Sequence, residues 1–207
     1  MRVWIALVTF LLASCGAEKP AEDKAKAPVK PPEVFRVKFV TTKGDIVVEA
    51  RREWAPRGAD RFYELVQEKF FDDSRFYRVI RKYVAQFGIH REPKMNALWG
   101  QLKFPDDPVK QKNDRGTLSF AHDGPATRTT QIFINLAGNN ILDKQGFAPF
   151  AKVVGGMDVV DQLTFVYGDL APRGAGPDPK RLERESNSYL DRAFPRLDAI
   201  KTARLLE

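Results

Sequence analysis

The sequence predicts a mainly β fold, a closed antiparallel barrel whose open ends are plugged by two α-helices. Three observations favour this class. From Val34 onward, short stretches of alternating apolar and polar residues recur, which is the pattern of half-buried strands. Loops that contain Gly, Pro or Asp separate these stretches, and only two segments have the apolar spacing of a helix. The 207 residues are 43% hydrophobic and 29% charged, as in globular proteins, and show no internal repeat.

A β-hairpin is expected at the start of this region. Phe35, Val37 and Phe39 alternate with basic residues, and apolar residues alternate again in DIVVEA, residues 45–50. The connecting sequence TTKGD contains Gly44, and glycine is typical of turns. The two strands should therefore pair as neighbours.

Two helices are expected. The first lies in APRGADRFYELVQEKFF, residues 55–71, where Pro56 suits a first helical position. Its apolar face is formed by residues at three- and four-residue spacing, namely Ala59, Phe62, Leu65, Val66 and Phe70. The second lies in GGMDVVDQLTF, residues 155–165, in which the residues in helical register are Met157, Val160 and Leu163.

The remaining strands are short. They are expected in RFYRVI, YVAQFGI, GTLSFA, QIFINLA and FAPFAKVV, with a closing strand in the tail IKTARLLE. Within QIFINLA, Gln131 and Phe133 share one strand face and Ile132 and Ile134 share the other, because side chains alternate along a strand. The polar face should therefore point toward a cleft and the branched face toward the core.

A long loop is expected at residues 167–187, which are rich in Gly and Pro. Gly174 and Gly176 do not stand between a strand and a helix, so they do not indicate a phosphate-binding loop.

The N-terminus has the pattern of an export signal. Arg2 precedes an apolar run, residues 3–12, which suits a secretory signal but is shorter than the ~20 residues that span a bilayer. The sequence LASC, ending at Cys15, resembles the bacterial lipobox, where the peptide is cut before the cysteine and its thiol receives a diacylglyceryl group. An ordinary signal peptide with an incidental cysteine is the alternative. Residues 1–14 are thus expected to be removed, leaving lipidated Cys15 and no disulfide, since there is no second cysteine.

A flexible tether is expected at residues 15–33. They are rich in Lys, Glu, Ala and Pro, and Val29 is their only large apolar side chain, so they cannot bury enough surface to fold. Residues 34–207 would then form one domain held at a membrane surface, exported and facing the periplasm. Gly16 after the cysteine indicates the outer membrane, by resemblance to lipoprotein sorting in enteric-type bacteria.

Several function classes are disfavoured. The net charge of +7 is spread over both signs with no dense basic block, which argues against nucleic-acid binding. His90 and His122 are the only histidines, and the single cysteine is expected to carry the lipid, so no metal site is expected. A serine hydrolase is also disfavoured, because no G-x-S-x-G motif is present.

Three blocks, in order, carry a family resemblance: FYRVI…AQFG, TLSFAHDGPATRTTQIFIN and LDKQGFAPFAKVVGGMDVVD. They resemble the cyclophilin-type peptidyl-prolyl cis–trans isomerases, most closely those of bacteria, from about residue 35 to the C-terminus. The resemblance implies a closed eight-stranded antiparallel barrel capped by two helices. It also implies an isomerase of X–Pro bonds that needs no cofactor.

The resemblance assigns roles by position. Arg78 matches the catalytic arginine, and Gln86 matches the glutamine that holds the substrate carbonyl. The implied substrate-binding residues are Tyr83, Val84, Phe120, Ala121, His122, Gln131, Phe133, Leu142 and Phe147. Some of these depart from the family: Tyr83 replaces a usual phenylalanine, Val84 a usual methionine and His122 a frequent asparagine. Many members have histidine in place of Phe147, and Ile141 stands where several carry a tryptophan that contacts cyclosporin.

An arginine among aromatic and branched residues, as in FYRVI, needs partners for its donors, and catalysis would supply one. We therefore expect a prolyl isomerase that acts on exported or membrane-proximal polypeptides, as a monomer anchored through its N-terminal lipid. The alternative is a proline-peptide-binding chaperone or surface lipoprotein with weak catalysis.

Overall fold

The computed structural model describes residues 30–206. The expected signal peptide, Cys15 and most of the expected tether lie outside the described residues. Within residues 30–206, no helix is long and apolar enough to cross a membrane.

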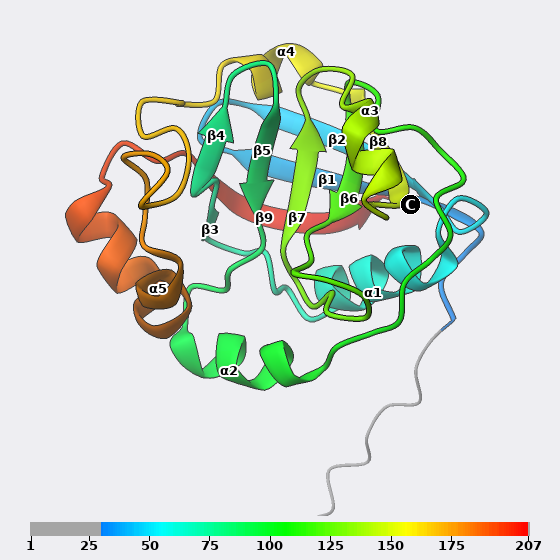
Figure 1. Ribbon diagram of the computed structural model, residues 1–207, viewed down its shortest axis with the longest axis horizontal. Coiled ribbons are helices and arrows are strands. Elements are labelled where there is room, and N and C mark those ends of the chain that lie inside the picture. Colours follow the sequence, from blue (N-terminus) through cyan, green and yellow to red (C-terminus); the bar gives the residue numbers. More distant parts are fainter. Residues whose placement is uncertain (1–29, 207) are drawn as a thin grey trace, which may run out of the picture.

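Over residues 30–206, the body of the protein is one strongly curled antiparallel sheet of nine strands (Figure 1). Its strand order is β3-β9-β1-β2-β8-β6-β7-β5-β4. The strands are β1 (Val34–Thr41), β2 (Asp45–Arg51), β3 (Ser74–Arg75), β4 (Arg78–Ile80), β5 (Val84–Phe87), β6 (Thr117–Phe120), β7 (Ile132–Asn135), β8 (Pro149–Gly155) and β9 (Ala199–Leu206). The expected hairpin is β1–β2, and the expected closing strand is β9, which pairs with β1.

The predicted closed eight-stranded barrel is wrong, because the sheet is open between β3 and β4. The sequence RFYRVI forms two short strands rather than one. Ser74 pairs with Ile200 of β9, whereas Arg78 pairs with Gln86 of β5, so the chain changes partners at residues 76–77. One segment therefore supplies both edges of the sheet.

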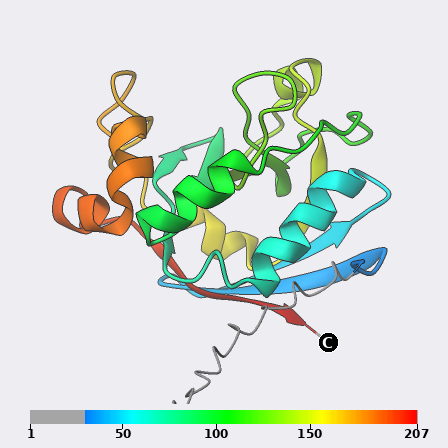
Figure 2. The same cartoon turned by 90° about the horizontal axis from the view of Figure 1, so that it is seen from below.

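Five helices lie around the sheet in the described part of the chain: α1 (Pro56–Gln67), α2 (Pro93–Gln101), α3 (Asn140–Lys144), α4 (Met157–Asp161) and α5 (Pro179–Ala193). The two expected helices correspond to α1 and α4, although α4 is shorter than predicted. Figure 1 shows α1 and α2 at one end of the curled sheet and α4 at the other, and Figure 2 shows α1 and α2 from below.

The prediction of a continuous loop over residues 167–187 is wrong in its second half, where α5 begins. Asp178 caps this helix, since its Oδ1 accepts a hydrogen bond of 2.8 Å from the Arg181 amide. The buried residues Leu182 and Leu190 give α5 an apolar face, and the helix is kinked at Ser186. All the glycines of the segment precede the helix, so composition averaged over 21 residues hid it.

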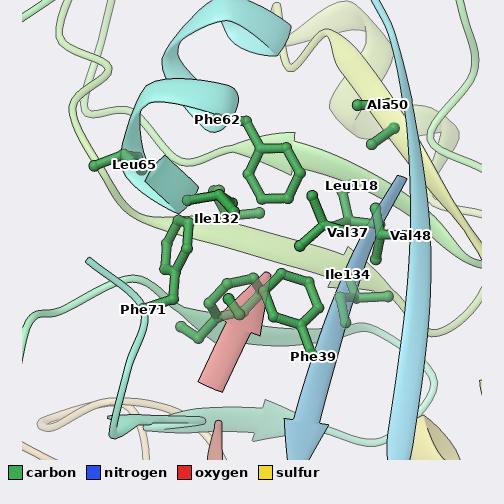
Figure 3. Packing of buried hydrophobic residues seen from close by; sticks show 14 of the residues in the cluster. Val37, Phe39, Val48, Ala50, Phe62, Leu65, Phe71, Leu118, Ile132 and Ile134 are labelled. Carbon is green, nitrogen blue, oxygen red and sulfur yellow. The ribbon is translucent and has the colours of Figure 1, made fainter. Parts of the chain in front are cut away.

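The main core fills the inside of the sheet and is rich in phenylalanine. Figure 3 shows side chains of α1 and of the strands converging there, with Phe62 of α1 among them. The Phe62 ring centroid lies 5.1 Å from that of Phe150 and 6.2 Å from that of Phe39. As predicted, Ile132 and Ile134 belong to this core, while Phe133 faces away from it.

Candidate active site

Three neighbouring strands place the two expected catalytic side chains and an expected substrate-binding side chain in one row. Arg78 on β4 pairs with Gln86 on β5, and Gln86 pairs with Phe133 on β7. Paired residues of adjacent antiparallel strands project to the same face, so all three side chains reach one surface of the sheet. The Arg78 side chain is only 15% exposed, so it does not project into bulk solvent.

A chain of hydrogen bonds connects this row. Arg78 Nη1 donates to Gln86 Oε1 at 3.0 Å, and Gln86 Nε2 donates to Gln131 Oε1 at 3.2 Å. The hydroxyl of buried Tyr77 donates to the same Gln131 oxygen at 2.6 Å. Burial raises the pKa of Tyr77 above its ordinary value, so the phenol stays protonated and remains a donor. The amide of Gln86 is thereby fixed with its oxygen toward the arginine.

A carboxylate completes the surroundings of the arginine. Arg78 Nε donates to Asp169 Oδ1 at 2.6 Å. Burial alone would raise the pKa of Asp169, but the hydrogen bond from Arg78 and other contacts outweigh burial and bring the pKa below its ordinary value. Asp169 is therefore charged at neutral pH. Sequence reasoning missed this residue, because a lone aspartate in a loop carries no signal of its partner.

An apolar pocket lies beside the guanidinium. Val84, Phe133 and Leu142 form its buried base, and Tyr83, Ala121 and Phe147 pack against them. The rings of Phe133 and Phe147 meet edge to face at a centroid distance of 5.5 Å. The guanidinium carbon of Arg78 lies 5.7 Å from the centre of the Tyr83 ring. A charged donor group and an apolar slot thus adjoin each other.

His122 closes one wall of the pocket. Its ring stacks on that of Phe147 at a centroid distance of 4.1 Å. Burial is the main cause that lowers the pKa of His122 below its ordinary value, so the ring is neutral at pH 7. Within residues 30–206, no group of three or more His, Cys, Asp or Glu side chains is arranged to hold a metal ion.

Except for Phe120, the predicted catalytic and substrate-binding residues all line one cleft of about 1380 Å³. The side chain of Phe120 lies in the main core, with its ring centroid 5.0 Å from that of Phe150. Phe120 follows the core residue Leu118 by two positions on β6, and residues two apart on a strand face the same side. The Phe120 side chain is therefore not part of the cleft lining, unlike the other predicted substrate-binding residues.

The cleft also continues beyond the predicted residues, between α2 and α5. Pro93, Lys94 and Lys103 line it from the side of α2, and Glu183 lines it from α5. Gln131 Nε2 lies 3.4 Å from Glu183 Oε1, so the site glutamine reaches this extension. Sequence reasoning missed this part of the cleft together with α5.

Comparison with known proteins identifies the family. A family model described as "Cyclophilin type peptidyl-prolyl cis-trans isomerase/CLD" matches residues 36–175, more than half of the chain. The chain belongs to the cyclophilin-type peptidyl-prolyl cis–trans isomerases. This cyclophilin is therefore an enzyme of that class, as the sequence predicted.

Relatives and solved structures agree. The cyclophilin is 36% identical over 141 residues to peptidyl-prolyl cis-trans isomerase B of Escherichia coli, covering 61% of this chain and 82% of that protein. It is 34% identical over 150 residues to an isomerase of Acinetobacter baylyi, covering 64% and 75%. A crystal structure of a Cryptosporidium parvum cyclophilin superposes with a TM-score of 0.61 at 20% identity, covering 84% of this chain and 98% of that one. The structural likeness supports the fold, a mainly β cyclophilin-like sheet.

Proposed function

We propose that this cyclophilin accelerates X–Pro rotation by a hydrogen bond from Arg78 to the prolyl nitrogen. The observation that carries the proposal is the position of the Arg78 guanidinium, held by Gln86 and Asp169 next to the pocket of Phe133. A proline ring in that pocket would bring its nitrogen near the remaining guanidinium hydrogens.

The chemistry requires no more than these groups. Twisting an X–Pro bond breaks amide resonance, and the uncatalysed step takes roughly 10–100 s. In the twisted state the nitrogen regains its lone pair and can accept a hydrogen bond that neither planar isomer accepts equally well. A donor aimed at this nitrogen therefore binds the transition state selectively, which is the condition for catalysis.

The arginine alone does not account for the rate. A charge-assisted hydrogen bond yields about 1.5–3 kcal/mol net, whereas a 10⁵-fold acceleration needs about 7 kcal/mol. The water-poor pocket of Tyr83, Phe133, Leu142 and Phe147 would supply the remainder by gripping the ring and strengthening the bond. Gln86 would hold the substrate carbonyl.

Backbone groups beside the pocket would align the peptide. The Ala121 amide donates to the Gln131 carbonyl at 2.8 Å, which fixes this segment beside the start of β7. The Ala121 carbonyl and the His122 amide would pair with a peptide. Residues of α2 and α5 line the cleft together with the pocket, so a bound polypeptide would contact these helices as well. A cleft with this lining also suits the alternative function, a proline-peptide-binding chaperone with weak catalysis.

Replacing Arg78 tests the mechanism and separates the two functions. In a protease-coupled assay on a short X-Pro-Phe peptide, Arg78→Ala should lower kcat/KM by about tenfold or more, while peptide binding is largely kept. Arg75→Ala is the matched control, because Arg75 lies on β3 and pairs with Asp191 rather than with the site. Wild-type speed in Arg78→Ala would show that the arginine mechanism is wrong, and slow catalysis in the wild type itself would favour the chaperone.

We also propose that the enzyme is exported and held at a membrane by a lipid on Cys15, with residues 15–33 as a tether. The support comes from the LASC sequence after a short apolar run. Its substrates would then be exported or membrane-proximal polypeptides that contain proline. We propose that it acts as a monomer and binds no nucleic acid.

A further inference from the structure

Asp169 holds the catalytic arginine from a segment outside the strands that form the pocket. Its Oδ1 accepts from Arg78 Nε at 2.6 Å and from the Leu170 amide at 2.8 Å. Its Oδ2 lies 3.3 Å from Arg173 Nε, and the aspartate side chain is 22% exposed. The carboxylate is therefore fixed by its own backbone and faces Arg78 in a defined orientation.

The loop that follows Asp169 folds back so that Gly174 and Gly176 lie against the backbone of Asp169 and Leu170. The Gly176 amide donates to the Asp169 carbonyl at 2.9 Å, and the Gly174 amide donates to the Leu170 carbonyl at 3.0 Å. A Cβ at residue 174 would lie 2.4 Å from the Asp169 carbonyl oxygen, and one at residue 176 would lie 2.6 Å from it. Only glycine fits at such distances, so both glycines serve to fix the backbone that carries the aspartate.

Helix α5 fixes this loop to the residue next to the arginine. Leu182, Tyr189 and Leu190 pack in one buried cluster with Tyr77, which directly precedes Arg78. The Tyr189 hydroxyl accepts a hydrogen bond of 3.1 Å from the Asp178 amide at the start of the helix. The loop and α5 thus contact the same short segment of chain that carries the arginine.

We propose that Asp169 is a positioning residue, which acts through Arg78 by holding its guanidinium plane in the orientation that catalysis requires. Nε is held by Asp169 and Nη1 by Gln86, and two bonds on different nitrogen atoms fix the plane of a rigid fork. The other guanidinium hydrogens are left for the peptide. The arginine side chain is then already ordered in the folded enzyme, so no rotamer freedom has to be lost when the transition state forms. This inference rests on the proposed role of Arg78.

Two substitutions separate the position of the guanidinium from its charge. Asp169→Ala removes both the acceptor and the negative charge, whereas Asp169→Asn keeps an oxygen that can accept from Nε. We expect kcat for an X-Pro-Phe peptide to fall about tenfold in Asp169→Ala with KM changed less than about twofold, because orientation matters mainly in the transition state. Asp169→Asn should keep most of the wild-type kcat.

Asp191→Asn is the matched control. Asp191 also belongs to the segment after β8 and also pairs with an arginine, since Arg75 Nη2 donates to it at 2.9 Å, but it does not contact Arg78. This variant should keep wild-type kcat and KM. Urea denaturation of all the variants shows whether each remains folded. If Asp169→Ala does not fold, exchange of the Arg78 Nε–H in the wild type decides the outcome, because rapid exchange there would contradict the positioning role.

Two further readouts distinguish positioning from a general structural role. In an Arg78→Ala background, Asp169→Ala should cause no further loss of activity, because the arginine through which it acts is gone. In NMR spectra, the Arg78 Nε–H signal should be protected from exchange with water in the wild type and in Asp169→Asn, and lost in Asp169→Ala.

The outcomes are distinguishable from those of the proposed function. If Arg78→Ala is slow but Asp169→Ala turns over as fast as the wild type, or faster, the positioning role is wrong and the arginine mechanism stands. If Arg78→Ala itself is fast, the arginine mechanism fails and the positioning role fails with it. An additional loss from Asp169→Ala in the Arg78→Ala background would also contradict the inference.

Discussion

The orientation of the Arg78 side chain is set by its hydrogen-bond partners, Gln86 and Asp169. Its aromatic and branched neighbours in the sequence indicated a need for hydrogen-bond partners, and the fold provides them from a neighbouring strand and from a loop 91 residues away. The family resemblance proposed Arg78, Gln86 and Phe133 by their positions in short, ordered blocks, and the fold brings these three residues to one cleft. Sequence reasoning could not identify Asp169, because nothing local to a loop aspartate specifies which cation it meets.

At the same scale, His122 gives a prediction about pH. Burial lowers its pKa, and a bound peptide would cover the ring further, so binding opposes protonation. KM should therefore rise roughly two- to threefold as the pH falls from about 7 to about 5.5. Peptide KM values measured across this range check the prediction.

His122→Asn provides the control, because asparagine does not titrate. The variant should lose the rise in KM at low pH while keeping activity at neutral pH. An unchanged pH dependence in His122→Asn would mean that another group is responsible.

At the scale of elements, the alternation of apolar and polar residues predicted most of the strands. It did not predict that RFYRVI divides into two strands, or that α5 forms, because both depend on tertiary contacts. RFYRVI reads as one strand, but Phe76 and Tyr77 are buried at the point where the chain changes partners, so the sheet stays open. Helix α5 was missed because Gly and Pro at residues 168–179 dominated the composition of the segment. The apolar face of that helix spans a kink at Ser186, which breaks the helical spacing.

Helix α5 should contribute to stability through its own small cluster. Leu190 is 1% exposed and packs with Tyr77 and Tyr189. Leu190→Ala should lower the free energy of unfolding by about 2–5 kcal/mol, because it leaves a cavity. Urea denaturation measures the change.

Leu98→Ala is the matched control for this substitution. Leu98 lies on α2 and is 54% exposed, so its replacement should change the free energy of unfolding by less than about 0.5 kcal/mol. Equal effects from the two substitutions would indicate that the α5 cluster contributes nothing beyond helix propensity.

At the scale of the whole molecule, the proposed location of the enzyme rests on the sequence of its N-terminal region. Under the lipoprotein proposal, Cys15→Ser should move the protein from the membrane fraction to the soluble fraction, because a chain without a lipid has no anchor. Fractionation of cells that express either form, followed by immunoblotting, measures the distribution. Isomerase activity of the released protein should be unchanged, and continued membrane retention of Cys15→Ser would refute lipidation at this residue.

The pairing of β3 with β9 bears on how firmly the strand that carries Arg78 is held. Ser74 and Arg75, which precede Arg78 in the chain, pair with Ile200 and Ala199 of β9. A nascent chain cannot form this strand pairing until residues 199–206 have been synthesised. We therefore expect the strand that carries Arg78 to be held less firmly in a chain that lacks residues 199–206 than in the finished protein.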